Sequence, residues 1–277
     1  MSTHSQLFAK AKGFTPLFAT PHISTLFGGI DGKTIPLKDH MLKELEMIAF
    51  PQTPLVVTSL CSKSHAVSVF CQEYPTIGPL WTDRRFLDLS DTSYPPRERY
   101  LPSLASILES MKKQVGMPYL WGGNAPPLTE MVSWYPPSVD FDKLPEKIQT
   151  HWQLKGVDCS GLLYLATKGY TPRNTSELVS FGIPVAIEGK EKNLWSLQGG
   201  DLIVWKGHVI IVLDPHRVIE SLGGKGVIIT PLFKRLEEIE SSLERKGRDM
   251  WPHGDSLMEK HTFIVRRWHR ETLGILS

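Results

Sequence analysis

One cysteine, Cys159, stands between a carboxylate and a hydroxyl in the segment Gly156-Val157-Asp158-Cys159-Ser160-Gly161. The apolar run from Leu162 to Ala166 follows directly and predicts a helix that begins at the cysteine. In the first turn of a helix, free backbone N–H groups and the helix dipole favour the negatively charged thiolate over the thiol. On this segment alone, a nucleophilic cysteine and an inert buried cysteine in a turn fit equally well.

A cysteine nucleophile needs a base, and the base needs a third group to orient its ring. Among the ten histidines, His208 follows the Lys206-Gly207 turn and opens a predicted strand. Glu220 ends the next predicted strand, and an antiparallel return through Asp214-Pro215 would bring it beside His208. We therefore predict a line of thiol, imidazole and carboxylate, in which Glu220 accepts a hydrogen bond from the Nδ1–H of His208. His216, in the intervening turn, is the rival third residue.

The first hundred residues contain short apolar runs separated by turns, a pattern that favours a small β-barrel. A charged helix is expected over residues 37–48, and Pro95-Pro96 lies in a polar segment that fits a linker. We therefore divide the chain into a β-barrel domain at residues 1–95 and a second domain at residues 101–277. The clearest strands are expected at residues 54–58, 66–70 and 78–82.

The second domain begins with a helical pattern from Leu101, with Ser103 as its N-cap and Gly116 as its end. Helices followed by a run of antiparallel strands predict an α+β fold. An amphipathic, highly charged helix is expected over residues 231–245. The strands are expected at residues 202–205, 208–213, 217–221 and 263–268.

Composition excludes several classes of protein. The chain is 41% hydrophobic and 22% charged with a formal charge of +2, and it lacks the basic stripe of a nucleic-acid-binding protein. No apolar run reaches the roughly 18 residues of a membrane span. The N-terminus has no signal-peptide core, so we expect a cytoplasmic protein. The sequence does not indicate an oligomeric state.

Three cysteines do not make a disulfide framework. Cys61 and Cys71 would pair only if they faced each other across a hairpin, and two separate buried thiols are the favoured interpretation. No two cysteines have the close spacing of zinc ligands, so we expect no metal. No organic cofactor is implied either.

Four motifs follow one another in a single order: Pro118-Tyr119-Leu120-Trp121-Gly122-Gly123, Asp158-Cys159-Ser160-Gly161-Leu162, Gly200-Asp201-Leu202-Ile203 and His208-Val209. In order and approximate spacing they resemble the NlpC family of bacterial cell-wall cysteine peptidases, and the resemblance covers about residues 101–270. It implies a papain-like α+β catalytic domain. The N-terminal barrel looks like the bacterial SH3-like domain that accompanies it in several members.

The resemblance also implies roles for individual residues. Cys159 would be the nucleophile and His208 the general base, while the third position falls at Glu220, where many members have histidine. Asp158 and Ser160 match positions that bind the free L-alanine amine of a peptidoglycan stem peptide, an interaction that a carboxylate suits. Tyr119 looks like the tyrosine that helps position the reacting carbonyl, although it also fits an aromatic residue packed under the helix.

A tyrosine from the barrel would complete the amine site, and Tyr74 is the candidate, although its position also fits an ordinary surface loop. The implied activity is that of a γ-D-glutamyl–diamino acid endopeptidase acting on stem peptides or muropeptides. An acyltransferase or amidase with the same triad, or a non-catalytic wall-fragment binding protein, are the alternatives. The connection at residues 124–155 is longer than the family's usual link, and we expect it to cover part of the cleft.

Overall fold

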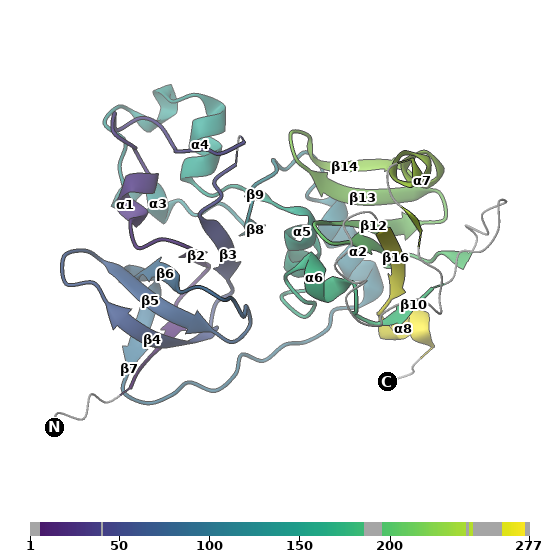
Figure 1. Ribbon diagram of the computed structural model, residues 1–277, viewed down its shortest axis with the longest axis horizontal. Helices are drawn as coiled ribbons and strands as arrows, with labels where there is room; N and C mark the ends of the chain where they lie inside the picture. Colours follow the sequence, from purple (N-terminus) through teal and green to yellow (C-terminus); the bar gives the residue numbers. More distant parts are fainter. Residues whose placement is uncertain (1–5, 40, 186–195, 242–243, 246–261, 275–277) are drawn as a thin grey trace. The chain divides into compact units, whose positions relative to one another are not determined.

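The structure is a computed structural model that describes residues 6–39, 41–185, 196–241, 244–245 and 262–274. It divides into two compact units. Unit 1 comprises Met1–Arg99 with Leu120–Val157, and unit 2 comprises Tyr100–Tyr119 with Asp158–Ser277. The chain is a mixed α/β protein (Figure 1).

Unit 1 is built on a seven-stranded sheet in the order β3-β2-β6-β5-β4-β1-β7. The three strands expected from sequence are confirmed as β4, β5 and β6. A short helix, α1 (Ile23–Leu26), and a 3-10 turn, η1 (Arg84–Phe86), interrupt the strand order. The strands are β1 (Leu7–Ala11), β2 (Thr15–Phe18), β3 (Leu45–Ala49), β4 (Pro54–Leu60), β5 (Ala66–Cys71), β6 (Leu80–Asp83) and β7 (Leu87–Ser90).

The helix predicted over residues 37–48 is wrong, because residues 45–48 belong to strand β3, which pairs with β2. Leu45, Met47 and Ile48 are buried, and the side chain of Asn124 forms two hydrogen bonds with the backbone of Ile48. Those bonds, 2.9 and 2.6 Å long, satisfy backbone groups on the β3 edge of the sheet. Pairing with a distant segment thus overrides the local helical spacing of charges.

The long connection belongs to unit 1. Its short strands β8 (Asn124–Ala125) and β9 (Gly156–Val157) pair with each other, and between them lie α3 (Glu130–Trp134), η2 (Phe141–Lys143) and α4 (Glu146–Trp152). Trp152 is fully buried, lies against Phe27, and donates a 2.8 Å hydrogen bond from Nε1 to the carbonyl of Tyr135. The connection is ordered, as expected, but it forms part of a hydrophobic core shared with residues 18–86. The division of the chain therefore differs from the two contiguous segments expected from sequence.

Unit 2 contains a second seven-stranded sheet, in the order β10-β16-β11-β12-β13-β14, with β15 on β16. Its helices are α2 (Leu104–Lys112), α5 (Cys159–Ala166), α6 (Thr175–Leu178), α7 (Leu232–Glu240) and α8 (Arg270–Leu273). Its strands are β10 (Ile183–Pro184), β11 (Leu202–Trp205), β12 (His208–Asp214), β13 (Arg217–Leu222), β14 (Gly226–Pro231), β15 (Glu244–Arg245) and β16 (Thr262–Arg267).

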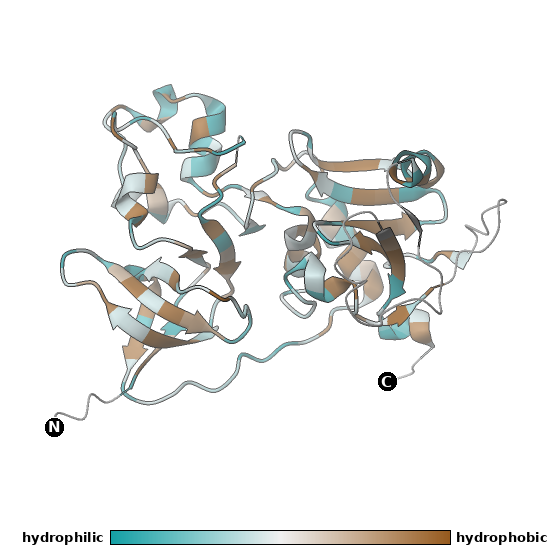
Figure 2. Ribbon diagram, viewed as in Figure 1, coloured by the Kyte–Doolittle hydropathy of each residue, from teal (hydrophilic) through white to brown (hydrophobic). Residues whose placement is uncertain are grey.

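The predicted elements of unit 2 are largely confirmed. Ser103 caps α2 by accepting a hydrogen bond from the backbone N–H of Ser106, and α5 begins at Cys159. Hydrophobic residues dominate the strands of the sheet, whereas α7 alternates hydrophobic and hydrophilic residues (Figure 2). Helix α5 packs against β12 and β13, and α7 packs against β13 and β14. Strand β13, which carries Glu220, therefore contacts both helices.

The third sequence motif has a structural role. Asp201 is fully buried, and its carboxylate accepts hydrogen bonds of 2.8 and 2.6 Å from Arg267 on β16 and one of 2.9 Å from the backbone N–H of Gln198. Gly200, at φ 92°, turns the chain into β11, and its carbonyl accepts a hydrogen bond from the Trp268 indole. These contacts fix the start of the hairpin that carries His208. Within the described residues, none of the helices combines the length and apolar character needed to cross a membrane.

Candidate active site

Cys159 is the first residue of α5, and Asp158 is its N-cap. The Asp158 carboxylate accepts a 2.6 Å hydrogen bond from the backbone N–H of Gly161, which satisfies one of the free donors of the first turn. The cysteine is largely buried, and its Sγ lies 4.0 Å from the carbonyl oxygen of Gly207. The thiol thus sits at the positive end of a helix dipole and against the turn that precedes His208.

His208 opens β12 after a two-residue turn, Lys206-Gly207, that links it to β11. Gly207 adopts φ 106°, a backbone conformation that glycine tolerates best. Its N–H donates a 3.0 Å hydrogen bond to the hydroxyl of Thr175, the first residue of α6. The ring of Trp205 lies 5.0 Å from the ring of His208, centroid to centroid. The imidazole is therefore held by its turn and by an aromatic neighbour.

Glu220 lies on the same face of the sheet as His208. Ile211 pairs with Ile219, so these two side chains share one face of the sheet. Because side chains alternate between the faces along a strand, His208 and Glu220 both lie on the opposite face. The Nε2 atom of His208 lies 2.7 Å from Oε2 of the fully buried Glu220. This corrects the expectation that Nδ1 would face the carboxylate. Cys159 is close enough to His208 to affect the pKa of the imidazole, and its Sγ contacts Gly207, so the structure brings the three predicted catalytic residues together.

The environment favours a charged imidazole. Burial lowers the pKa of His208, but the neighbouring Cys159 and the hydrogen-bonded Glu220, with their charges, outweigh burial and raise the pKa to about 9. Burial likewise raises the pKa of Glu220, yet the hydrogen bonds from His208 and Arg235 leave that pKa below its ordinary value. The pair therefore favours imidazolium beside carboxylate.

Arg235, on α7, is a residue that sequence reasoning missed. Its Nε donates to Oε1 of Glu220 at 2.6 Å, and its Nη2 donates to Oε2 at 2.9 Å. Glu220 thus has a two-point contact with an arginine as well as its contact with His208. No local sequence pattern predicts this contact, because it depends on the face of the sheet that α7 covers. His216, the rival third residue, is exposed in the turn between β12 and β13.

Asp158 and Ser160 form a buried network with Arg173. The guanidinium donates to Oδ1 and Oδ2 of Asp158 at 3.0 and 2.6 Å, and to the hydroxyl of Ser160 at 2.9 Å. Ser160 Oγ also lies 3.3 Å from Oδ1 of Asp158. The Arg173 side chain is 2% exposed and that of Asp158 is 11% exposed. Both predicted amine ligands therefore lie beside the nucleophile and have a cationic partner within the fold.

The two predicted tyrosines lie in different units. Tyr119, in unit 2, is half-buried, and burial together with the nearby charges of Asp158 and Cys159 raises the pKa of its phenol. It is therefore a neutral hydrogen-bond donor at physiological pH. Tyr74, in unit 1, is buried rather than exposed in a loop, and its hydroxyl donates a 3.0 Å hydrogen bond to Glu46.

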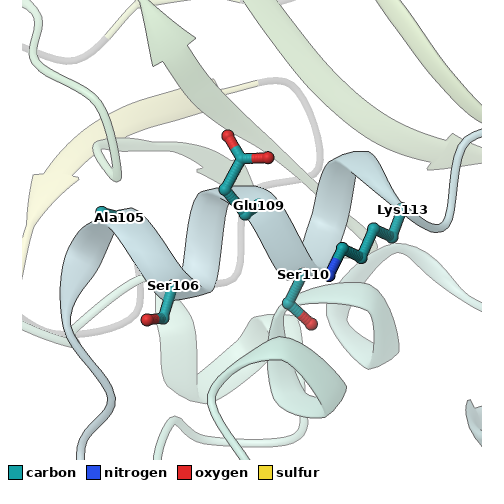
Figure 3. A pocket seen from close by; sticks show the side chains of 5 residues that line it. All are labelled: Ala105, Ser106, Glu109, Ser110 and Lys113. Atoms are coloured by element: carbon teal, nitrogen blue, oxygen red, sulfur yellow. The ribbon is translucent and has the colours of Figure 1, made fainter.

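A pocket elsewhere in unit 2 does not coincide with this site. A pocket of about 390 Å³ lies on α2 and is lined by Ala105, Ser106, Glu109, Ser110 and Lys113, none of them a predicted site residue (Figure 3). Across the described ranges, no three His, Cys, Asp or Glu side chains are placed to hold a metal ion. Cys61, Cys71 and Cys159 are all free thiols.

Comparison with known proteins bears on residues 116–240, which match the NlpC/P60 family. A search of curated proteins found no match. Among solved structures, an NlpC/P60 family protein from Bacillus cereus is 17% identical, with a TM-score of 0.35 over 95% of this chain and 64% of that one. The peptidoglycan hydrolase RipB from Mycobacterium tuberculosis is 24% identical, with a TM-score of 0.32 over 47% of this chain and 58% of that one.

RipD from Mycobacterium tuberculosis, a non-catalytic NlpC/p60 domain protein adapted to peptidoglycan binding, is 20% identical, with a TM-score of 0.32. The match covers 48% of this chain and 90% of RipD. This chain spans less than two thirds of the lengths of the Bacillus cereus protein and RipB. The sequence match over residues 116–240 includes Cys159, His208, Glu220 and Arg235, and the chain therefore carries an NlpC/P60 family domain there.

Proposed function

We propose that this protein is a cysteine peptidase with a papain-like catalytic domain that hydrolyses peptidoglycan stem peptides. The observation that carries the proposal is the line of three side chains in unit 2. Cys159 begins a helix, its Sγ lies against the turn that precedes His208, and the buried Glu220 holds Nε2 of the imidazole at 2.7 Å. A nucleophile, a base and an orienting group in this order are the parts that acyl transfer to a thiol requires.

In the proposed mechanism, His208 takes the proton from Cys159, and the thiolate attacks the scissile carbonyl. The backbone N–H of Cys159 and the neutral Tyr119 hydroxyl stabilise the oxyanion. The imidazolium then gives its proton to the leaving amine as the C–N bond breaks, which leaves a thioester on Cys159. Water, deprotonated by His208, hydrolyses the thioester and regenerates the thiol.

The proposed cleavage is at the bond between γ-D-glutamate and a diamino acid in a stem peptide with a free N-terminal L-alanine. The substrate ammonium would bind the exposed edge of the Asp158 carboxylate and the Ser160 hydroxyl. Arg173 would hold both groups in place, because its contacts approach them from the buried side. We further propose that the sheet of unit 1 is an SH3-like domain and that it contributes Tyr74 to this amine site.

Incubation with the tripeptide L-Ala-γ-D-Glu-diaminopimelate tests the proposal. The unmodified protein should release L-Ala-γ-D-Glu, and Cys159→Ala should release none. An added amine tests for an acyltransferase, since such an enzyme would pass the dipeptide to the amine faster than to water. Binding of the tripeptide without cleavage would favour a wall-fragment binding protein and contradict the proposal.

The amine site has a separate test. An N-acetylated tripeptide carries no ammonium, so the protein should cleave it with a much higher KM than the free peptide. Asp158→Asn should raise KM for the free peptide and leave KM for the acetylated peptide unchanged. Equal cleavage of both peptides by the unmodified protein would contradict the assignment of Asp158 and Ser160. Tyr74→Phe should raise KM only for the free peptide if Tyr74 belongs to the amine site.

A further inference from the structure

We infer that Arg235 is a positioning residue for the catalytic line, acting through a two-point contact that fixes the carboxylate of Glu220 against His208. The inference rests on the proposed cysteine chemistry and deepens it. Arg235 touches none of the reacting atoms, so its effect must pass through Glu220. Its contribution is then both geometric, through the planar guanidinium, and electrostatic, through its charge.

The contacts define the orientation of the carboxylate completely. Oε1 of Glu220 accepts from Nε of Arg235, while Oε2 accepts from Nη2 of Arg235 and contacts Nε2 of His208. A carboxylate with a single partner can rotate about its terminal bond, but one held at both oxygens by a planar guanidinium cannot. The oxygen that meets the imidazole is therefore fixed in the plane that Arg235 sets.

The packing of α7 on the sheet fixes the position of Arg235. Helix α7 begins at Leu232, directly after β14, which pairs with β13 along six residues. Leu232, Leu236 and Ile239 are buried against Val218 and Ile210, so α7 covers the face of the sheet that carries Glu220 and His208. Arg235 lies within the same turns as Leu232 and Leu236, and packing of these leucines therefore fixes where the guanidinium lies.

Among the residues that the structure describes, few charges surround the line. From α7 come Arg235 and Glu238, whose Oε2 lies 3.1 Å from Nη1 of Arg235 and whose side chain is half-exposed. From β12 comes His208, and from β14 the residue paired with Glu220 is the uncharged Ile228. At the other end lie Cys159, the half-buried Tyr119, and Asp158 with its partner Arg173. Arg235 is thus the cation that balances the buried Glu220 when His208 is neutral.

The sign of the effect follows from Coulomb's law. A nearby positive charge favours loss of a proton from the thiol and from the imidazolium. Removing the charge of Arg235 should therefore raise the pH at which the Cys159 thiolate forms, by about one unit. Arg235→Lys keeps the charge but makes a one-point contact, so it should leave that pH unchanged and lower kcat by about tenfold.

Alkylation of Cys159 by iodoacetamide as a function of pH measures the first effect in the full-length protein. Mass spectrometry of the Cys159 peptide separates it from Cys61 and Cys71. For Arg235→Met we expect the reactivity profile to shift upward by about one unit, with tenfold slower alkylation on the acid side of the wild-type midpoint. The matched control is Arg217→Met, which removes the same charge from an exposed arginine on β13, three residues from Glu220, where it pairs with Asp214. It should leave the profile in place.

Several results would overturn the inference. They are a wild-type profile in Arg235→Met, an equal shift in Arg217→Met, and a wild-type kcat in Arg235→Lys. Thermal melting of each variant shows whether it is folded. If Arg235→Met does not fold, the kcat of Arg235→Lys decides whether the inference holds. Because alkylation needs no peptide substrate, the inference about Arg235 can hold even if no stem peptide is cleaved. Conversely, stem-peptide cleavage with an unshifted Arg235→Met profile would defeat the inference alone.

Discussion

The Nε2 atom of His208 lies 2.7 Å from Oε2 of Glu220, a carboxylate with no exposed surface. This contact commits one ring nitrogen to the carboxylate and leaves Nδ1 as the nitrogen that can take the proton of Cys159. The ring is thus oriented from the side of the sheet covered by α7, while the thiol approaches from the start of α5. One end of the catalytic line, Cys159, lies on α5, and the other, Glu220, lies on β13, which contacts both α5 and α7.

Replacing Glu220 with glutamine should keep the size of the side chain but remove its charge. We expect kcat/KM to fall by at least about tenfold, because the ring loses its orienting acceptor. The alkaline limb of the rate, near pH 9 in the wild type, should move to lower pH, because the imidazolium loses a stabilising charge. A pH series of kcat/KM measures both effects. Glu238→Gln, which alters an exposed partner of Arg235, is the control and should retain the wild-type limb.

The raised pKa of His208 also predicts how stability depends on pH. The pKa is about 9 in the folded protein against an ordinary 6.5, so the folded state binds this proton more tightly than the unfolded chain does. The resulting stability is fully present below pH 6.5 and is lost as the pH rises through about 9. As the pH rises through this range, the difference in unfolding free energy between the wild type and His208→Asn should therefore shrink by up to about 3 kcal/mol. Urea unfolding at a series of pH values measures it, and a constant difference would contradict the prediction.

Thr175 anchors the turn that carries the base. Its hydroxyl accepts a 3.0 Å hydrogen bond from the Gly207 N–H, so Thr175→Val should release the turn and cost about 1 kcal/mol of stability. We expect kcat to fall while KM stays close to that of the wild type, because the loss affects alignment of His208 rather than substrate binding. Steady-state kinetics on the stem tripeptide measure kcat and KM separately. Thr175→Ser keeps the acceptor and should behave as the wild type; equal losses in both variants would disprove the role of the hydroxyl.

Trp152 tests the finding that the long connection belongs to the core of unit 1. Its side chain is fully buried and hydrogen-bonded, so Trp152→Ala should destabilise unit 1 by about 3–5 kcal/mol. Exposed Trp121, just before the connection, provides the control, and its replacement should cost far less. Chemical denaturation followed by tryptophan fluorescence and circular dichroism measures both. A small loss in Trp152→Ala would contradict the place of the connection in that core.

This finding also changes how the cover hypothesis must be tested. Shortening residues 124–155 would remove part of a hydrophobic core that includes Met131, Leu144 and Trp152, so loss of activity would follow from unfolding. Point changes on exposed residues of the connection keep the core intact. The substrate range of such variants is the measurement that addresses a cover.

The sequence predicted the strands around the site because their residues are buried on both faces and bounded by clear turns, as in β11 and β12. Cys159 and His208 follow from the same local patterns, since one begins a helix and the other follows a glycine turn. Arg235 does not, because its contact with Glu220 depends on which face of the sheet α7 covers. The contact between Asp158 and Arg173 does not follow from a local pattern either, because Arg173 lies fifteen residues away in a loop.

Unit 1 was harder to predict for the same physical reason. Strand β3 has charged neighbours at helical spacing, and only its pairing with β2 and the side chain of Asn124 make it a strand. Asn124 is seventy-six residues from Ile48 in the sequence, and no local pattern reports such a contact. The aromatic residues of the connection indicated burial correctly, but the core in which they are buried is set by distant residues such as Phe27.

The central claim is that Cys159 forms a thioester with the γ-D-glutamyl carbonyl, and trapping that intermediate tests it most directly. The protein is mixed with excess L-Ala-γ-D-Glu-diaminopimelate, quenched in acid within the first turnover, and digested for mass spectrometry. We predict an L-Ala-γ-D-Glu adduct on the Cys159 peptide that hydroxylamine removes and that His208→Asn does not form. Cleavage of the peptide that persists in Cys159→Ala, or an unmodified Cys159 peptide during active turnover with an adduct elsewhere, would contradict the account.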